Sequence, residues 1–306
     1  MKRPTMAAFS PKSSSTKYSS RSISFPARSH PSTQRIEQVL NKLKACQETY
    51  SSSKAETICN GLCGLRELYG CIEDLLDLPS TQQALAAHDQ NEKWVNELLD
   101  SSLRYLDICS KSRDAILLMK ESVRELESAL RRRKVGDSSI ESDVVSYLCF
   151  RKKMKREIGL SLKQMEGKYG TLPLDLDNHL CAVVRVLRES SLIAGSIFRS
   201  LFLFLSSPLL KPKQQSRWSL VSIMVHKGIV SEDEKRSVNE LESVDIALSN
   251  LSLQNSSEDS EDDKFECAQK RLEALEVGIE GLENGLECLF RLLIHKRVAL
   301  LNILSL

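Results

Sequence analysis

The feature that most constrains this chain is an apolar heptad pattern near its C-terminus. Apolar side chains recur there at alternating steps of three and four residues, over at least three heptads. This spacing places them on one side of a helix, where they can pack against a facing helix. We predict one long helix with a packing seam made of Leu272, Leu275, Ile279, Leu282, Leu286, Leu289 and Leu293. The pattern does not decide whether this seam packs within the chain or between two chains.

Three glycines interrupt the same segment: Gly278, Gly281 and Gly285. Each costs about 1 kcal/mol relative to alanine in a helix interior. We interpret them as positions where another helix approaches closely, since a glycine has no Cβ to hold that helix away.

Helical patterning extends over most of the chain that precedes this segment. Ser53 and Glu56 predict a capping box, Pro79 a helix end, and the absence of Pro and Gly from 89 to 134 one continuous helix. A break near residues 110–112 is the alternative. The 306 residues include only 12 Gly and 8 Pro, too few for a turn-rich β-protein. The predicted fold class is all-α: an elongated antiparallel helical bundle with long helices and a disordered N-terminal tail.

The predicted organisation has two parts. Residues 1–31 form a basic, Ser-rich tail without an acidic residue, which buries too little apolar surface to fold. Residues 32–306 form a helical bundle domain, with a Pro-containing linker near 207–216 and an acidic loop near 254–264.

The longest apolar stretch, residues 192–210, contains Arg199 and ends at Ser206-Ser207-Pro208. A membrane-spanning helix needs about 20 predominantly apolar residues. We therefore predict a buried helix and no transmembrane span. A segment that dips into a membrane is the alternative.

The sequence predicts no catalytic residue, no cofactor and no metal site. Phosphate-binding loops, zinc-protease and hydrolase motifs and kinase signatures are absent from it. Cys59 and Cys63 lie four residues apart and could supply two zinc ligands, but structural zinc requires four. We interpret them as small packing residues. Nine irregularly spaced cysteines favour a reducing compartment over a disulfide framework.

Basic clusters occur at residues 131–134 and 151–156. We interpret them as solvated helix surface, with a nuclear signal or contact with acidic lipid as alternatives. Neither cluster has an aromatic platform, which argues against nucleic-acid binding.

The tail contains a sharper motif, Arg21-Ser22-Ile23-Ser24-Phe25-Pro26. With a phosphate on Ser24 it matches the recognition sequence of 14-3-3 proteins. The phosphate supplies the charge that an arginine cluster binds, and Pro26 turns the chain out of the groove. The candidate phospho-motif is Arg21, Ser22, Ser24 and Pro26.

Residues 21–31, 275–294 and 297–304 together resemble a plant-restricted family of unknown function related to the BYPASS proteins. The resemblance implies a plant protein associated with root and shoot development. It implies no catalytic residue, cofactor or partner.

These observations predict a non-enzymatic interaction or regulatory protein of the cytoplasm or nucleus. The alternative is a peripheral membrane or plastid-associated protein that uses its basic N-terminus as an anchor or a transit peptide, because acid-poor, Ser- and Arg-rich N-termini are typical of plastid import signals.

Overall fold

The computed structural model describes residues 31–46, 54–87, 92–132, 139–165, 178–207, 238–252 and 261–305. These residues form helices and no strand, so the predicted all-α fold is confirmed. The helices are α1 (Pro31–Ala45), α2 (Ala55–Leu76), α3 (Pro79–Ala86), α4 (Lys93–Arg131), α5 (Ser139–Gln164), α6 (Asn178–Leu205), α8 (Glu240–Ser252) and α9 (Glu261–Leu304).

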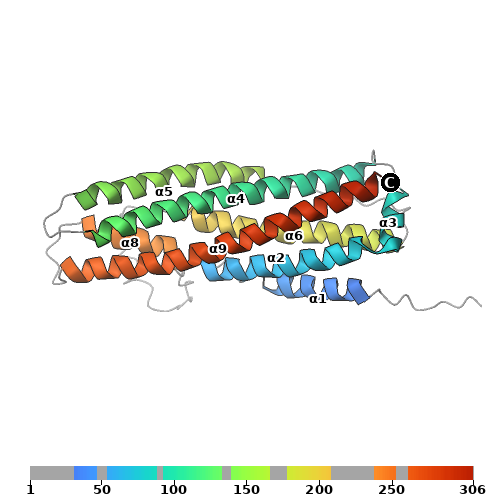
Figure 1. The fold of residues 1–306 in the computed structure, drawn as a ribbon, viewed down its shortest axis with the longest axis horizontal. Helices are drawn as coiled ribbons and strands as arrows, with labels where there is room; N and C mark the ends of the chain where they lie inside the picture. The colour runs from blue at the N-terminus through green and yellow to red at the C-terminus, as the bar shows by residue number, and fades with distance from the viewer. Residues whose placement is uncertain are drawn as a thin grey trace, which may run out of the picture.

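Two antiparallel helices, α4 and α9, run along the whole length of the bundle (Figure 1). Their 39 and 44 residues correspond to about 60 and 65 Å at a rise of 1.5 Å per residue. α4 continues through the serines where a break was the alternative. There the Ser112 hydroxyl donates a hydrogen bond to the Ile108 carbonyl at 2.8 Å.

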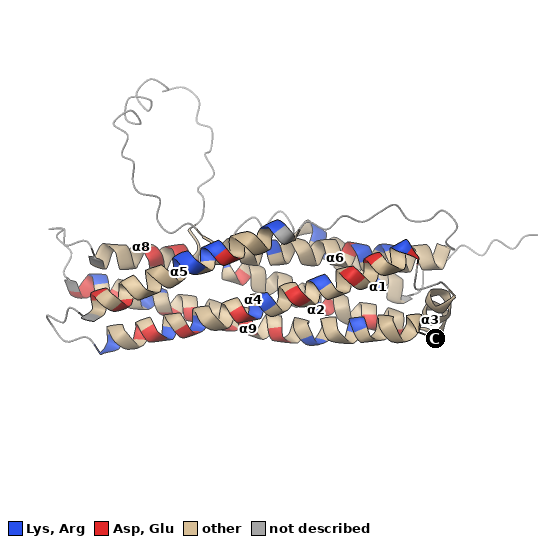
Figure 2. Cartoon of the chain, turned by 90° about the horizontal axis from the view of Figure 1, so that it is seen from above, with Lys and Arg blue, Asp and Glu red and all other residues tan. Residues whose placement is uncertain are grey.

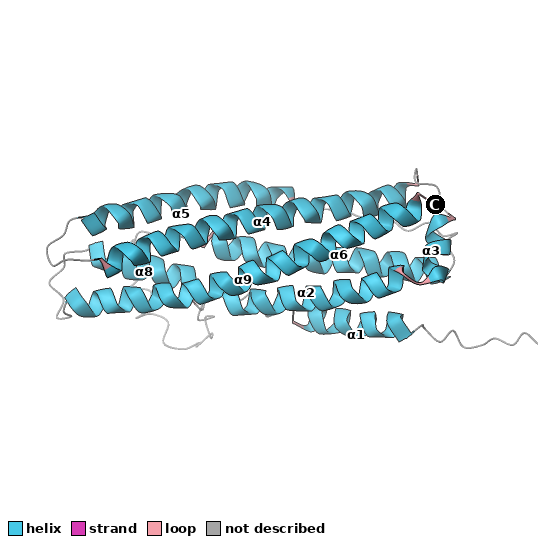
Figure 3. Cartoon of the chain, in the orientation of Figure 1, coloured by secondary structure: helices cyan, strands magenta, loops and turns pink. Residues whose placement is uncertain are grey.

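Shorter helices complete each half of the bundle around these two. α2 and α6 pack in the half that holds the C-terminus, and α5 and α8 pack in the other half (Figure 1). α1 lies outside α2 and α6, and α3 closes one end (Figure 1). Figure 3 shows the same elongated arrangement, with only short connections described between the helices. α6 and α8 therefore follow each other along one side of the bundle.

Burial of apolar side chains holds these helices together. α6 carries the long apolar stretch and buries it: Phe198, Leu201, Phe202 and Phe204 are at most 1% exposed. Removing such side chains from water is the main favourable contribution to folding. In the described part of the chain, every helix is too short or too polar to cross a membrane.

Several predicted boundaries shift in the structure. α2 ends at Leu76, before Pro79, and Pro79 begins α3, because proline fits the first turn of a helix. The predicted acidic loop near 254–264 is wrong at its C-terminal end, because α9 already begins at Glu261. Acidic side chains are favourable in a first turn, where backbone N–H groups lack partners.

Pro31 is the first residue of α1, and the rest of the predicted tail lies outside the described residues. Of the predicted linker near 207–216, only Ser207 is described.

Candidate functional site

The predicted packing seam lies inside the molecule. All seven of its residues, from Leu272 to Leu293, are at most 2% exposed. They belong to α9, which packs against α2, α4 and α8 of the same chain. The seam is therefore used within the chain.

The glycines of α9 face α2. A Cβ added at Gly278 would lie 2.8 Å from the Cβ of Ala55, and one at Gly281 would lie 3.0 Å from the sulfur of Cys59. One at Gly285 would meet a Leu62 methyl at 3.0 Å. α2 and α9 thus approach so closely that a larger side chain would force them apart, as the interpretation of these glycines requires.

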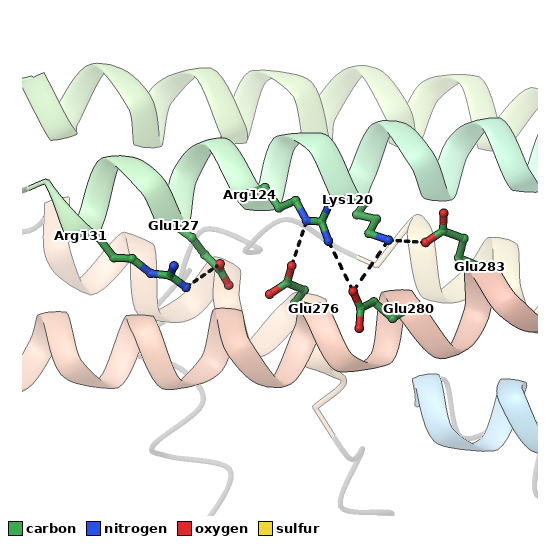
Figure 4. A network of polar contacts seen from close by, with 7 residues as sticks. All are labelled: Lys120, Arg124, Glu127, Arg131, Glu276, Glu280 and Glu283. Atoms are coloured by element: carbon green, nitrogen blue, oxygen red, sulfur yellow. Dashed lines mark hydrogen bonds and ion pairs between the residues drawn. The ribbon is translucent and has the colours of Figure 1, made fainter.

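A strip of ion pairs joins α4 to α9 on the surface (Figure 4). The Arg124 guanidinium lies 3.0 Å from Glu276 and 3.4 Å from Glu280, and Lys120 pairs with Glu280 and Glu283. The basic members come from α4 and the acidic members from α9. Exposed ion pairs stabilise a fold weakly, by about 0–1 kcal/mol. Because the cations lie on α4 and the carboxylates on α9, these ion pairs nevertheless favour the packing of α4 against α9 in this register.

A broad open groove of about 900 Å³ lies over α4, between α5 and α9. Lys120, Arg124 and Glu283 line it, together with Asp143 and Ser146 of α5. The first three are already engaged in the ion-pair strip. Among its described lining residues there is no histidine or cysteine. The groove therefore combines the paired charges of the strip with further charged side chains, among them Glu121, Glu125 and Asp143.

Glu127 lies at one end of the strip and is 4% exposed. One carboxylate oxygen accepts a hydrogen bond from Arg131 at 3.2 Å, while the other has no hydrogen-bond partner among the described residues (Figure 4). Burial raises the pKa of Glu127, and the nearby Glu276 raises it further.

A buried polar junction lies where α6 ends and α8 begins. Arg151 of α5 is fully buried, donating a hydrogen bond to the Leu205 carbonyl at 2.6 Å and another to Asp245 at 3.1 Å. The Asn239 side chain donates to the Ser207 hydroxyl. One arginine thus joins α5, the last turn of α6 and α8.

Burial governs the electrostatics of this junction. It raises the pKa of Asp245, and the facing Arg151 guanidinium opposes that shift. Burial also raises the pKa of Tyr147, one turn before Arg151. A buried ion pair is strongly coupled, because each charge lacks water to replace its partner. The junction therefore connects the three helices through a buried, coupled ion pair.

Sequence reasoning missed this junction because it assigned Arg151 to a solvated cluster. The spacing nevertheless indicates a buried position, because Arg151 falls in the apolar series formed by Val144, Tyr147, Met154 and Ile158. All four of these residues are buried. The predicted solvated surface is wrong for Arg151, whereas Lys152, Lys153 and Arg156 are exposed.

The N-terminus of α2 is bound by a residue that is distant in the sequence. Its N-cap is Lys54, which makes no side-chain capping bond, and Ser53 of the predicted capping box lies outside the described residues. Instead, the Ala55 N–H donates to the Glu240 carboxylate of α8 at 3.2 Å. A carboxylate is favourable there because the helix dipole is positive at that end.

The two cysteines considered as zinc ligands lie in different surroundings. Cys59 is half-buried against α9, and burial, followed by Glu240, raises the pKa of its thiol to about 11. Cys63 is exposed and accepts a hydrogen bond from Arg66. The described residues contain no group of three or more His, Cys, Asp or Glu arranged around a metal position. The absence of structural zinc stays a prediction.

The candidate phospho-motif, Arg21, Ser22, Ser24 and Pro26, lies outside the described residues. α1 begins at Pro31, five positions after Pro26.

Fold and site together define an all-helical bundle protein whose described polar clusters join helices to one another. Comparison with family models then gives the identity: the chain belongs to the family described as Protein BPS1, whose model matches residues 61–303. That family is not a known enzyme family. Searches among curated proteins and among solved structures gave no match.

Proposed function

We propose that this chain is a non-catalytic regulatory protein of plants that acts by binding other proteins, with phosphorylated Ser24 as a docking point for 14-3-3 proteins. The observation that supports a non-catalytic role is the pairing of charges: in the described part, Arg124, Lys120 and Arg151 all engage carboxylates that join helices. Catalysis by acid or base needs a group left available to the substrate. A role in root and shoot development follows from the family resemblance.

The motif supplies the chemistry of recognition. Arg21 provides the basic context that many kinases require, Ser24 accepts the phosphate and Pro26 redirects the chain. A phosphate carries nearly two negative charges and binds arginines through charge-assisted hydrogen bonds. The unmodified hydroxyl gives such arginines nothing to pair with, so binding should require phosphorylation.

A set of synthetic peptides covering residues 17–31 tests this proposal. We expect the peptide phosphorylated on Ser24 to bind a plant 14-3-3 protein with a micromolar or lower Kd, and the unmodified peptide to bind at least tenfold more weakly. A peptide phosphorylated on Ser22 is the matched control, since it carries the same charge at the wrong distance from Pro26. Equal affinities for all three peptides would refute the motif.

The second candidate function is that of a peripheral membrane or plastid-associated protein. The acid-free N-terminal segment favours it, because seven Lys or Arg residues precede Glu37. N-terminal mass spectrometry on protein from plant tissue separates the two candidates. A chain that begins near α1 indicates a removed transit peptide, whereas a chain that retains Ser24 supports regulation through the tail.

A further inference from the structure

Exposed cations with few acidic residues beside them lie on one side of the bundle, on α5 and α6. On α4, Arg113, Lys120 and Arg124 all pair with carboxylates of α9. On α5 and α6, by contrast, five exposed cations make no ion pair with any described residue: Lys152, Lys153, Arg156, Lys163 and Arg199.

Antiparallel packing of α5 and α6 brings these cations together. The bond from Arg151 to the Leu205 carbonyl sets the register. Counting five residues forward along α5 and five backward along α6 from that bond places Arg156 level with Ser200, next to Arg199. Figure 2 looks onto this side of the bundle, with α5 in front and blue residues along it.

Exposed leucines lie among the cations. Leu160 of α5 is 62% exposed, and Leu192 and Leu203 of α6 are 56% and 45% exposed. From the same register, Leu203 lies level with Lys153, and Lys163 lies level with Ile193, next to Leu192. The α5–α6 face, defined as these five cations and three leucines, therefore alternates positive charge with apolar side chains along two adjoining helices. Glu157 is the exposed acid within this stretch of α5.

We propose that the α5–α6 face docks on an anionic lipid surface. The negative potential of acidic headgroups attracts clustered Lys and Arg side chains. Exposed leucines can enter the boundary between headgroups and acyl chains, while the long basic side chains keep their charges in the headgroup layer. Helices that lie flat in this way need no membrane-spanning segment.

The composition of the face favours lipid over nucleic acid or an acidic protein. Among the exposed described residues of α5 and α6 none is aromatic, so bases have no stacking platform. The leucines are separated by cations, which suits a fluid headgroup layer better than the continuous apolar groove that binds a partner helix. This surface is independent of the tail and of Ser24.

Co-sedimentation of the full-length chain with vesicles tests the proposal. We expect binding to vesicles of phosphatidylcholine with phosphatidylserine, at least tenfold weaker binding to phosphatidylcholine alone, and loss of binding as salt rises. The triple variant Lys152→Gln, Lys153→Gln, Arg156→Gln should lose at least tenfold in affinity. Leu160→Gln should weaken binding without changing net charge.

The matched control is Lys42→Gln, Arg104→Gln, Lys111→Gln, which removes the same charge from exposed positions on α1 and α4. We expect it to bind as the unaltered chain does, and circular dichroism verifies the fold of each variant. Equal losses in both triple variants would refute the proposal by assigning binding to net charge. Binding that depends on the α5 residues but occurs only with duplex DNA or an acidic peptide, and not with vesicles, would refute it as well.

Discussion

At the scale of single residues, the glycines of α9, which have no Cβ, decide how near α2 can lie. The Cβ of Ala55 is fixed to its backbone and cannot rotate away from a new methyl group at Gly278. Glycine to alanine normally stabilises a helix interior. At Gly278 the clash with Ala55 should make the same substitution destabilising.

We expect Gly278→Ala to lower the free energy of unfolding by about 1–3 kcal/mol, as overpacking does in well-packed cores. Gly70→Ala on α2 is the control, because nothing lies within 4 Å of a Cβ added there. It should raise the free energy by up to about 1 kcal/mol. Urea titrations measure both, and a stabilising Gly278→Ala would contradict the close approach of α2 and α9.

A second residue-scale prediction concerns Lys296, which interrupts the heptad pattern. Its side chain is buried, with the ammonium nitrogen 4.8 Å from the centre of the Tyr69 ring. Burial lowers the pKa of Lys296 to about 8, compared with about 10.4 for an unfolded lysine. Between these pH values the unfolded state binds more protons, so the free energy of unfolding contributed by Lys296 rises with pH.

We expect Lys296→Met to stabilise the chain at pH 7 and to lose most of that advantage at pH 10. The pKa difference corresponds to on the order of 3 kcal/mol, which the contact with the Tyr69 ring reduces. Urea titrations at the two pH values measure the difference between variant and unaltered chain. An advantage that is the same at both pH values would show that Lys296 does not titrate in this window.

Residue periodicity is what the sequence revealed most directly. The leucine positions of α9 follow from spacing alone, because burial of one helix face repeats every three to four residues. Periodicity locates a buried position but does not name what lies across from it. The partners of Lys296 and Arg151 come from other helices, Tyr69 and Asp245, which no local pattern identifies.

At the scale of helices, the buried junction connects α5 with α6 and α8. Removing one member of a buried ion pair leaves the other charge without partner or water, which costs about 3–5 kcal/mol. Replacing both members by apolar side chains removes that penalty. The double variant therefore distinguishes a coupled pair from two independent contributions.

We expect Arg151→Met and Asp245→Leu each to lower the free energy of unfolding by about 3–5 kcal/mol. The double variant should lose less than the sum of the two, by at least about 1 kcal/mol, measured by urea unfolding. Simple additivity would mean that the two side chains act separately.

Element boundaries also depended on distant residues. The start of α2 is held by Glu240, 185 positions away. A local capping motif at Ser53 could not have indicated this contact. By contrast, the length of α4 followed from its lack of Pro and Gly, because nothing in that stretch interrupts the backbone hydrogen bonds.

At the scale of the whole molecule, α4 and α9 give the bundle its length, and the shorter helices divide it into two halves (Figure 1). An elongated antiparallel bundle was predictable from helix length. Its division into halves was not, because it depends on α6 and α8 following each other along one side. The junction at Arg151 holds these two helices in that order.

A bundle joined in this way should keep its structure when a partner binds near its N-terminus. Phosphorylation of Ser24 should therefore change which proteins bind, without altering the helices. Capture of a short extended segment orders few residues, so its entropic cost is small.

The most direct test of this account is calorimetric titration of the full-length chain, with and without phosphate on Ser24, against a plant 14-3-3 protein. We predict micromolar or tighter binding only for the phosphorylated chain, with unchanged helical circular dichroism and unchanged Tm in the two unbound forms. Binding of equal strength without phosphate, or no binding by the phosphorylated chain, would contradict it.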